Sequence, residues 1–178
     1  MGLDAVEIIM GWEQAFDINF TDAEVERITT PKIAIELITS KLTAKENIPD
    51  ICLQIRIDHQ VQQALQIVLS LPPSQIKPAS KLRHLLPPSQ RSKNWQQICS
   101  HLGVPKLPKI STIPIFIPTT VKDLVDWLTA HYPSYFLSPN ERWTPPQIRT
   151  VVRAVIKDIV GTNDFTDDND LVTEIGIS

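Results

Sequence analysis

Residues 3–16 read LDAVEIIMGWEQAF, and this stretch carries the clearest fold signal in the chain. Apolar side chains recur in it at positions 3, 6, 9, 10, 12 and 16, which predicts one broad apolar stripe on an amphipathic helix. Glu7 and Glu13 lie off that stripe, so we expect both to face solvent. Residues 17–19 should end this helix, and Thr21 or Asp22 should begin a short second one.

Further helical patterns alternate with proline-containing connections along the rest of the chain. We expect helices at residues 31–42, 59–71, 92–102, 119–128 and 144–160. The last pattern is the strongest, because Thr144 can cap it, prolines occupy its first turn and Gly161 can end it. Its expected apolar face comprises Ile148, Val151, Val152, Val155, Ile156 and Ile159. Leu171, Val172 and Ile175 should anchor the loop that follows.

Residues 104–118 contain four prolines and the apolar run 113–117, for which we expect an extended buried loop. No second segment offers itself as a pairing strand. The expected fold class is therefore all-α.

The composition is that of an ordinary folded protein with one domain or two small ones. The chain has 178 residues, of which 42% are hydrophobic, and no apolar run reaches the ~18 residues that a membrane span needs. The N-terminus has no basic segment of the kind that begins a secretory signal. Cys52 and Cys99 make neither a metal-binding nor a redox spacing, so we expect free thiols and a cytoplasmic protein.

Charge is distributed unevenly along the chain. Residues 1–44 carry 8 acidic and 3 basic side chains, residues 45–140 carry 5 and 10, and residues 141–178 carry 7 and 4. Two interpretations stay open: the segments attract one another in the folded chain, or the basic middle has an acidic partner. The bases are scattered without interleaved aromatic residues, so we do not expect nucleic-acid binding.

Residues 3–42 resemble the part of an acyl carrier protein that follows its attachment serine. The segment Val6-Glu-Ile-Ile-Met10 is similar to the core of the recognition helix of that family, and residues 22–30 are similar to its third helix and the turn into the fourth. Pro31 stands where the family usually has valine, which a first-turn position tolerates. The resemblance implies the second half of a four-helix carrier fold.

Residues 146–178 resemble the missing first half, although in the family that half comes first. Ile159-Val-Gly161 is similar to the end of the first helix, and Asp167-Asp-Asn-Asp-Leu171 to the loop that follows it. Glu174-Ile-Gly-Ile-Ser178 is similar to the approach to the attachment site. The two pieces would tile one fold with almost no gap. We therefore expect a circularly permuted carrier domain formed by residues 1–44 and 145–178, with the last helix packed on the helices at 3–16 and 31–42.

The position equivalent to the attachment serine is Gly2, and a looser register places Ala5 there. Neither residue has a hydroxyl group, so the resemblance implies a carrier domain without a phosphopantetheine arm and without another cofactor. Ser178, next to the reconstructed junction, and Ser89, in the middle of the chain, remain as alternative sites for 4'-phosphopantetheine.

Residues 57–130 are expected to form a second helical module, with residues 45–56 and 131–144 as connectors. The order of its helices, including Thr119-Thr-Val-Lys-Asp-Leu124, is similar to that of a carrier domain. The helix that should be acidic carries Arg91 and Lys93 instead. A divergent carrier-like repeat and an unrelated helical insert both remain open.

The sequence gives no sign of catalytic or metal chemistry. His59, His84, His101 and His131 share no metal-ligand spacing, and the chain lacks a Gly-rich phosphate loop and a G-x-S-x-G motif. Asp167, Asp168 and Asp170 lack the Gly and the closing Glu of a calcium loop, so a solvated acidic loop is expected. We expect a protein that is not an enzyme and has no metal site.

The resemblance implies protein–protein interaction through the acidic residues Asp4, Glu7 and Glu13, with a partner that has a basic docking surface. A functional acyl or peptidyl carrier modified at a non-standard serine is one alternative. A small-molecule or lipid-binding helical protein is another, supported by the apolar run 113–117. No membrane partner is expected, and a dimer that exchanges its terminal segments stays open.

Overall fold

The structure, a computed structural model, describes residues 2–42, 52–108, 119–138 and 141–177. The fold class is all-α, as predicted: these ranges contain helices and no strand, apart from one isolated antiparallel bridge between Lys81 and Thr120. The chain forms two compact units. Unit 1 consists of Met1–Leu53 and Thr129–Ser178, and unit 2 of Gln54–Leu128. The N-terminal and C-terminal segments therefore share unit 1.

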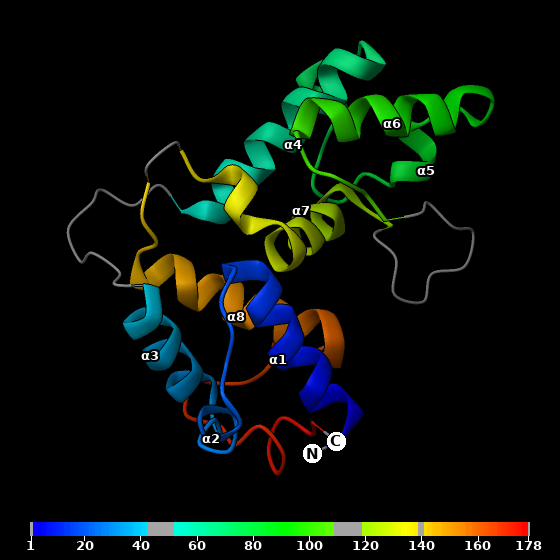
Figure 1. The fold of residues 1–178 in the computed structure, drawn as a ribbon. Coiled ribbons are helices and arrows are strands. Elements are labelled where there is room, and N and C mark those ends of the chain that lie inside the picture. The colour runs from blue at the N-terminus through cyan, green and yellow to red at the C-terminus, as the bar shows by residue number, and fades with distance from the viewer. Residues whose placement is uncertain (1, 43–51, 109–118, 139–140, 178) are drawn as a thin grey trace. The chain divides into compact units, whose positions relative to one another are not determined.

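Unit 1 is built around α8 (Pro145–Val160), which packs on both α1 (Leu3–Phe16) and α3 (Pro31–Leu42) of the same chain (Figure 1). The short helix α2 (Asp22–Val25) joins α1 to α3. Trp12 of α1 is fully buried and donates a hydrogen bond from Nε1 to the carbonyl oxygen of Val152, at 3.3 Å. This bond and the surrounding apolar side chains join α1 to α8.

The predicted beginning and end of α8 are confirmed, and so is its predicted apolar face except for Ile159, which is half-buried. The Thr144 side chain accepts a hydrogen bond from the Gln147 N–H, and the Gln147 side chain accepts one from the Thr144 N–H. Gly161 ends the helix at φ 82°, a backbone conformation that favours glycine. Ile148, Val151, Val152, Val155 and Ile156 are all buried.

The predicted apolar stripe of α1 is confirmed only in part, because Trp12 and Phe16 are buried but other predicted members are not. The buried side chains of this helix are Ile8, Trp12, Ala15 and Phe16. Leu3, Val6 and Met10, which were expected to face the core, are 72%, 42% and 60% exposed. Because α1 has more apolar positions than one helix face can hold, its packing against α8 selects which of them are buried.

Two segments of unit 1 differ from expectation. Residues 131–144, expected to be a connector, contain the 3₁₀ helix η3 (Pro133–Phe136), which packs on α1. In the same segment Trp143 meets Phe16 edge to face, with ring centroids 4.8 Å apart. In the C-terminal loop, Leu171 and Ile175 are buried as predicted, but Val172 is 64% exposed.

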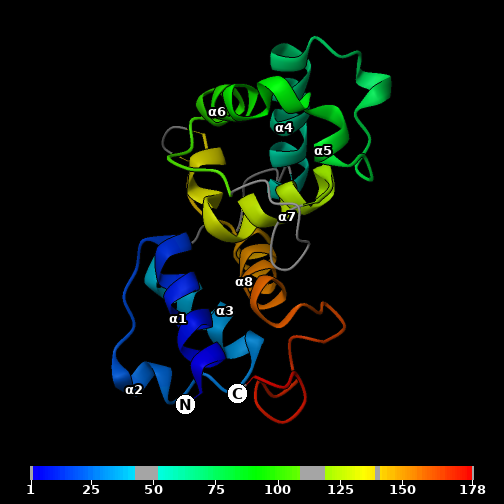
Figure 2. The ribbon, with the colours of Figure 1, turned by 90° about the vertical axis from the view of Figure 1, so that its right-hand side faces the viewer.

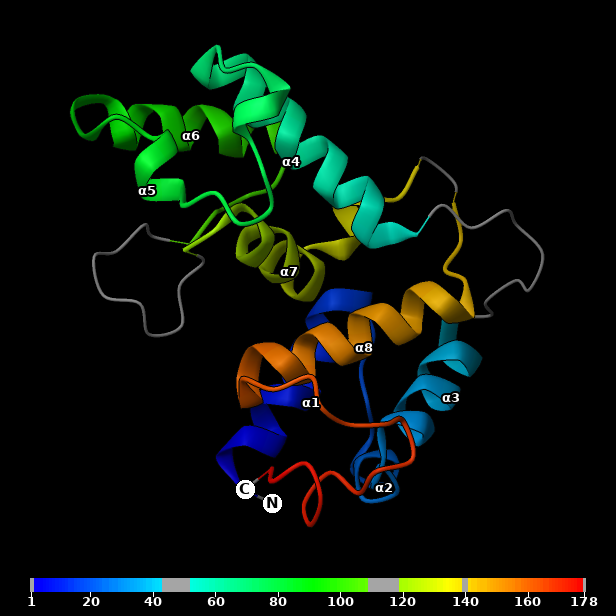
Figure 3. The ribbon, with the colours of Figure 1, turned by 180° about the vertical axis from the view of Figure 1, so that it is seen from behind.

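The C-terminal loop runs along the other segments of unit 1 (Figures 2 and 3). The Lys32 N–H donates to the Asp167 carbonyl oxygen at 2.9 Å, and the Leu171 N–H donates to the Thr29 carbonyl oxygen at 2.9 Å. These bonds tie the loop to the beginning of α3. Segments from opposite ends of the sequence are thus held together by main-chain contacts as well as by the packing of α8.

Unit 2 contains α4 (Leu53–Leu69, in this unit from Gln54), α5 (Leu82–Leu85), α6 (Arg91–Leu102) and α7 (Val121–His131, in this unit up to Leu128). The 3₁₀ helices η1 (Pro73–Gln75) and η2 (Pro88–Gln90) lie in its connections. Gln54 Nε2 donates to Asp126 Oδ1 at 2.8 Å and so joins α4 to α7. The helix predicted at residues 59–71 begins earlier, at Leu53, and α5 lies between the helices predicted at 59–71 and 92–102, where no helix was predicted. The run 113–117 lies outside the described residues.

Candidate docking surface

The outer face of α1, defined here by Leu3, Val6 and Met10, is an exposed apolar surface of unit 1. Leu3, Val6 and Met10 follow one another at spacings of three and four residues, so they lie on one side of the helix. All three side chains are exposed to solvent, whereas other apolar side chains of the same helix are buried in the core of unit 1. Isolated exposed apolar side chains are common, but three neighbours on one helix face form a patch of the kind that marks interaction surfaces.

The three acidic residues predicted to contact a partner have different surroundings. Glu7 is exposed and lies on the same side of α1 as Val6 and Met10. Asp4 is half-buried in the first turn, where a carboxylate interacts favourably with the helix dipole. Glu13 is also half-buried, and its Oε1 accepts a hydrogen bond from the Phe20 N–H at 2.8 Å. Glu7 is therefore the best placed for a partner, whereas Glu13 also holds the loop after α1.

The described residues considered for cofactor attachment belong to different units of the chain. Gly2 is exposed directly before α1, in the N-cap position, and no side-chain hydrogen bond caps the helix there. Ser89 is exposed in η2 of unit 2. Ser178 lies outside the described residues. Thus the position that the resemblance equates with the attachment serine is accessible but has no nucleophilic side chain.

An apolar pocket lies on the other side of α1 from the exposed patch. It has a volume of about 220 Å³ and is lined by residues of α1, of the segment after α2 and of the C-terminal loop. Ile8, Trp12 and Leu171 contribute apolar walls, and Ala5 and Ile177 line it from opposite ends of the sequence. The sequence did not predict this pocket, because its walls come from three distant segments.

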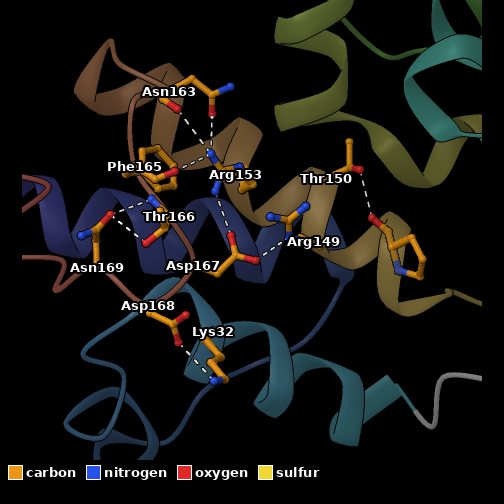
Figure 4. A network of polar contacts seen from close by, with 11 residues as sticks. Lys32, Arg149, Thr150, Arg153, Asn163, Phe165, Thr166, Asp167, Asp168 and Asn169 are labelled. Atoms are coloured by element: carbon orange, nitrogen blue, oxygen red, sulfur yellow. Dashed lines mark hydrogen bonds and ion pairs between the residues drawn. The ribbon is translucent and has the colours of Figure 1, made fainter.

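A cluster of ion pairs fixes the C-terminal loop on α8 and α3 (Figure 4). Arg153 Nη1 contacts Asp167 Oδ1 at 2.8 Å, and Arg149 Nε contacts the other oxygen of this carboxylate. Arg153 also donates to the Phe165 carbonyl oxygen at 2.8 Å and lies over the Phe165 ring. Lys32 Nζ lies 3.1 Å from Asp168 Oδ1. The loop expected to be merely solvated is thus held by specific contacts.

These contacts shift the pKa of carboxyl groups in the expected direction. Partial burial tends to raise the pKa of Asp167, but the hydrogen bonds from Arg149 and Arg153 outweigh it and hold this pKa below its usual value. Hydrogen bonds from Thr173 lower the pKa of Asp170. Elsewhere in unit 1, a hydrogen bond from Lys41 is the main cause that lowers the pKa of Glu24 to about 2. Each of these groups stabilises the fold in its charged form.

Two kinds of site are not found in the described part of the chain. No three His, Cys, Asp or Glu side chains gather there in a way that could hold a metal ion. None of the helices in those ranges is both long enough and apolar enough to cross a membrane.

No family model matches the chain, and no solved structure matches it.

Proposed function

We propose that this protein is a non-enzymatic, acyl-carrier-like protein that acts through protein–protein contact at the outer face of α1. The observation that carries the proposal is the exposure of Leu3, Val6 and Met10 beside Glu7. A partner that covers this face removes apolar area from water at about 25 cal/mol per Å². Its specificity comes from the acidic side chains, which favour a basic surface. Unit 1 has 17 acidic and 8 basic residues, so its net charge attracts such a partner.

We also propose that unit 1 is a circularly permuted carrier-like domain without a phosphopantetheine arm. Support for this proposal comes from α8, which packs on α1 and α3 of the same chain. Further support comes from Ile177 and Ala5, which line one pocket near the two ends of the chain. Gly2 offers no hydroxyl at the position equivalent to the attachment serine, so the domain keeps a docking surface without carrier chemistry.

Affinity capture from the native host tests the docking proposal. The bait is the full chain in three forms: wild type, the α1 variant L3S/V6S/M10S, and the control I55S/I67S. Ile55 and Ile67 are 65% and 63% exposed on α4, so the control removes comparable apolar area from unit 2. We expect the α1 variant to lose a partner that wild type and control both retain. Equal capture by all three forms would contradict the proposal.

A functional carrier modified at a non-standard serine is the first alternative, and the exposure of Ser89 favours it. The test is the intact mass of the full chain after incubation with a phosphopantetheinyl transferase and coenzyme A. We expect an unchanged mass. A phosphopantetheine adduct that disappears in S89A would establish the alternative, and an adduct that persists in S89A would point to another residue such as Ser178.

Binding of a small apolar ligand is the second alternative, and the 220 Å³ pocket beside Trp12 favours it. An apolar cavity of roughly 150 Å³ can hold benzene, so the volume suffices for a ring or a short alkyl chain. Titration with benzene and with short-chain fatty acids, followed by the fluorescence of the full chain, tests this function. A saturable change that is lost in A5F, which fills the pocket, would support it.

A further inference from the structure

A second concave feature of unit 1 runs along the seam between α1 and α8. We call it the α1–α8 groove; its volume is about 610 Å³, and residues of α1, the loop after α1, α8 and the end of α7 line it. The seam is narrow beneath the groove, because Gly11 lets Val155 of α8 approach α1 closely. The two helices therefore form a tightly packed floor with a groove above it.

The charge of the groove has one sign. Its lining includes the carboxylates of Glu7, Glu13, Asp17 and Asp158, and none of its lining residues is Lys or Arg. His131 Nε2 lies 3.0 Å from Asp158 Oδ2, so this carboxylate has a neighbour. The carboxylates of Glu7 and Asp17 have no hydrogen-bond or ion-pair partner among the described residues. Two acidic groups in the groove thus remain available for a cation.

The same groove has apolar walls. Met10, Ile18, Val155 and Ile159 all line it. An ion with a full hydration shell gains nothing from such walls, whereas the methylene stem of a lysine or arginine side chain can lie along them while its charged end meets the carboxylates. The lining therefore fits a cation on an apolar stem better than a small inorganic cation.

The groove is continuous with the outer face of α1, because Glu7 and Met10 belong to both. A protein segment that lies on Val6 and Met10 can place its next side chains in the groove. A free polyamine would have to bind in the groove without this additional contact. This continuity favours a segment of a partner protein as the occupant.

We propose that the α1–α8 groove receives a lysine or arginine side chain from an amphipathic basic segment of the partner. The proposal rests on the proposed function, since it assumes that the partner docks on α1. It adds the chemistry of the partner and the place where its charge is bound. Asp17 and Asp158, which also line the groove, become part of the docking surface.

The test is an NMR titration of the ¹⁵N-labelled full chain with three probes. The first is a synthetic amphipathic helix of leucine and arginine, the second is the same peptide with glutamate for arginine, and the third is spermidine. We expect saturable shifts of the Gly11 and Ala130 amide signals with the basic peptide alone. Spermidine bound as tightly as the peptide, or the acidic peptide bound equally well, would overturn the proposal.

Isosteric variants locate the binding site. E7Q/D17N removes the two unpartnered carboxylates while keeping the size of each side chain, and asparagine tolerates the left-handed conformation of residue 17, at φ 53°. We expect the affinity for the basic peptide to fall about fivefold at low salt. The control D22N/E36Q removes the same charge from residues outside the groove, so it changes the net charge equally and should weaken binding much less. Equal weakening by both variants would overturn the proposal.

The failure of this proposal can be told apart from the failure of the proposed function. If the peptide shifted the amide signals of Leu3 and Val6 but not that of Ala130, the groove would be rejected as a binding site, and docking on the outer face of α1 would still stand. Peptide binding in the groove, together with unchanged capture of host proteins by L3S/V6S/M10S, would support the groove and reject the outer face of α1.

Discussion

Gly11 of α1 lies directly against Val155 of α8: a Cβ atom added to Gly11 would stand 2.7 Å from Val155 Cγ1. Real Cβ atoms hardly ever approach so closely. Because Val155 is buried, its side chain has little room to move away. The absence of a side chain at Gly11 therefore allows α1 and α8 to pack closely at this point.

We predict that Gly11→Ala destabilises unit 1. Overpacking typically costs about 1–3 kcal/mol, and the better helix propensity of alanine returns up to about 1 kcal/mol. The expected net loss in the free energy of unfolding is about 1–2 kcal/mol, measured by urea denaturation. Val155→Ala provides the matched background, because it removes the methyl groups that clash. In that background Gly11→Ala should leave the free energy of unfolding unchanged or raise it. If Gly11→Ala lowered this free energy as much as it does in the wild type, the contact with Val155 would not be the cause of the destabilisation.

The capping box at the beginning of α8 should also be important for stability. Thr144 is 5% exposed, so water cannot easily replace its hydrogen bond to the Gln147 N–H. We expect Thr144→Ala to lower the free energy of unfolding by about 1–2 kcal/mol. Thr144→Ser, which keeps the hydroxyl group, should lose much less. Thr21 makes the same kind of cap on α2, which is short and exposed, so Thr21→Ala should have the smaller effect of the two alanine variants. The reverse order would contradict this assignment.

The ion pairs of Asp167 predict how stability depends on pH. The folded-state pKa of Asp167 is lowered, so its charged form stabilises the fold. This contribution is complete above the ordinary carboxyl pKa of 3.8 and is lost as the pH falls through the lower folded-state pKa. Other carboxyl groups with lowered pKa values are present in both proteins when wild type is compared with Asp167→Asn, so their contributions cancel.

The difference in unfolding free energy between wild type and Asp167→Asn should therefore be level at neutral pH and should shrink below pH 3.8. Urea denaturation over a pH series measures it. Asp164→Asn, in the same loop, is the control, because the Asp164 carboxylate has no ion-pair or hydrogen-bond partner among the described residues. A difference for Asp167→Asn that stays constant down to pH 2 would show that Arg149 and Arg153 do not stabilise its charged form.

The sequence predicted α8 well because every signal agreed there. The cap at Thr144, the prolines in the first turn, the apolar period and Gly161 all indicate one helix with one buried face. The sequence predicted α1 as a helix but not its orientation. Ile8 and Ala15 are buried although they were outside the predicted stripe, and Leu3 and Met10 are exposed although they belonged to it, because of how α8 lies on α1. The excess of apolar positions around α1 was the only available sign that some of them would face solvent.

The candidate surface was predictable only in part. Glu7 was selected through the resemblance and is exposed on α1. The other members of the groove lie far apart in the sequence: Asp17 follows α1, His131 ends α7 and Asp158 belongs to α8. Patterns in a single sequence relate residues of the same helix or strand to one another. They therefore give no sign of a groove that three separate segments form together. The ion pairs of Asp167 with Arg149 and Arg153 were not predicted for the same reason.

Site-specific photocrosslinking in the native host tests whether a partner protein contacts the outer face of α1. A benzophenone-bearing residue replaces Val6 in one form of the full chain and the similarly apolar Ile67 of α4, which is 63% exposed, in another. We predict a discrete crosslinked product from position 6, with a protein whose crosslinked peptide is rich in Lys or Arg, and no such product from position 67. The same product from both positions, or none from position 6, would contradict the proposed contact.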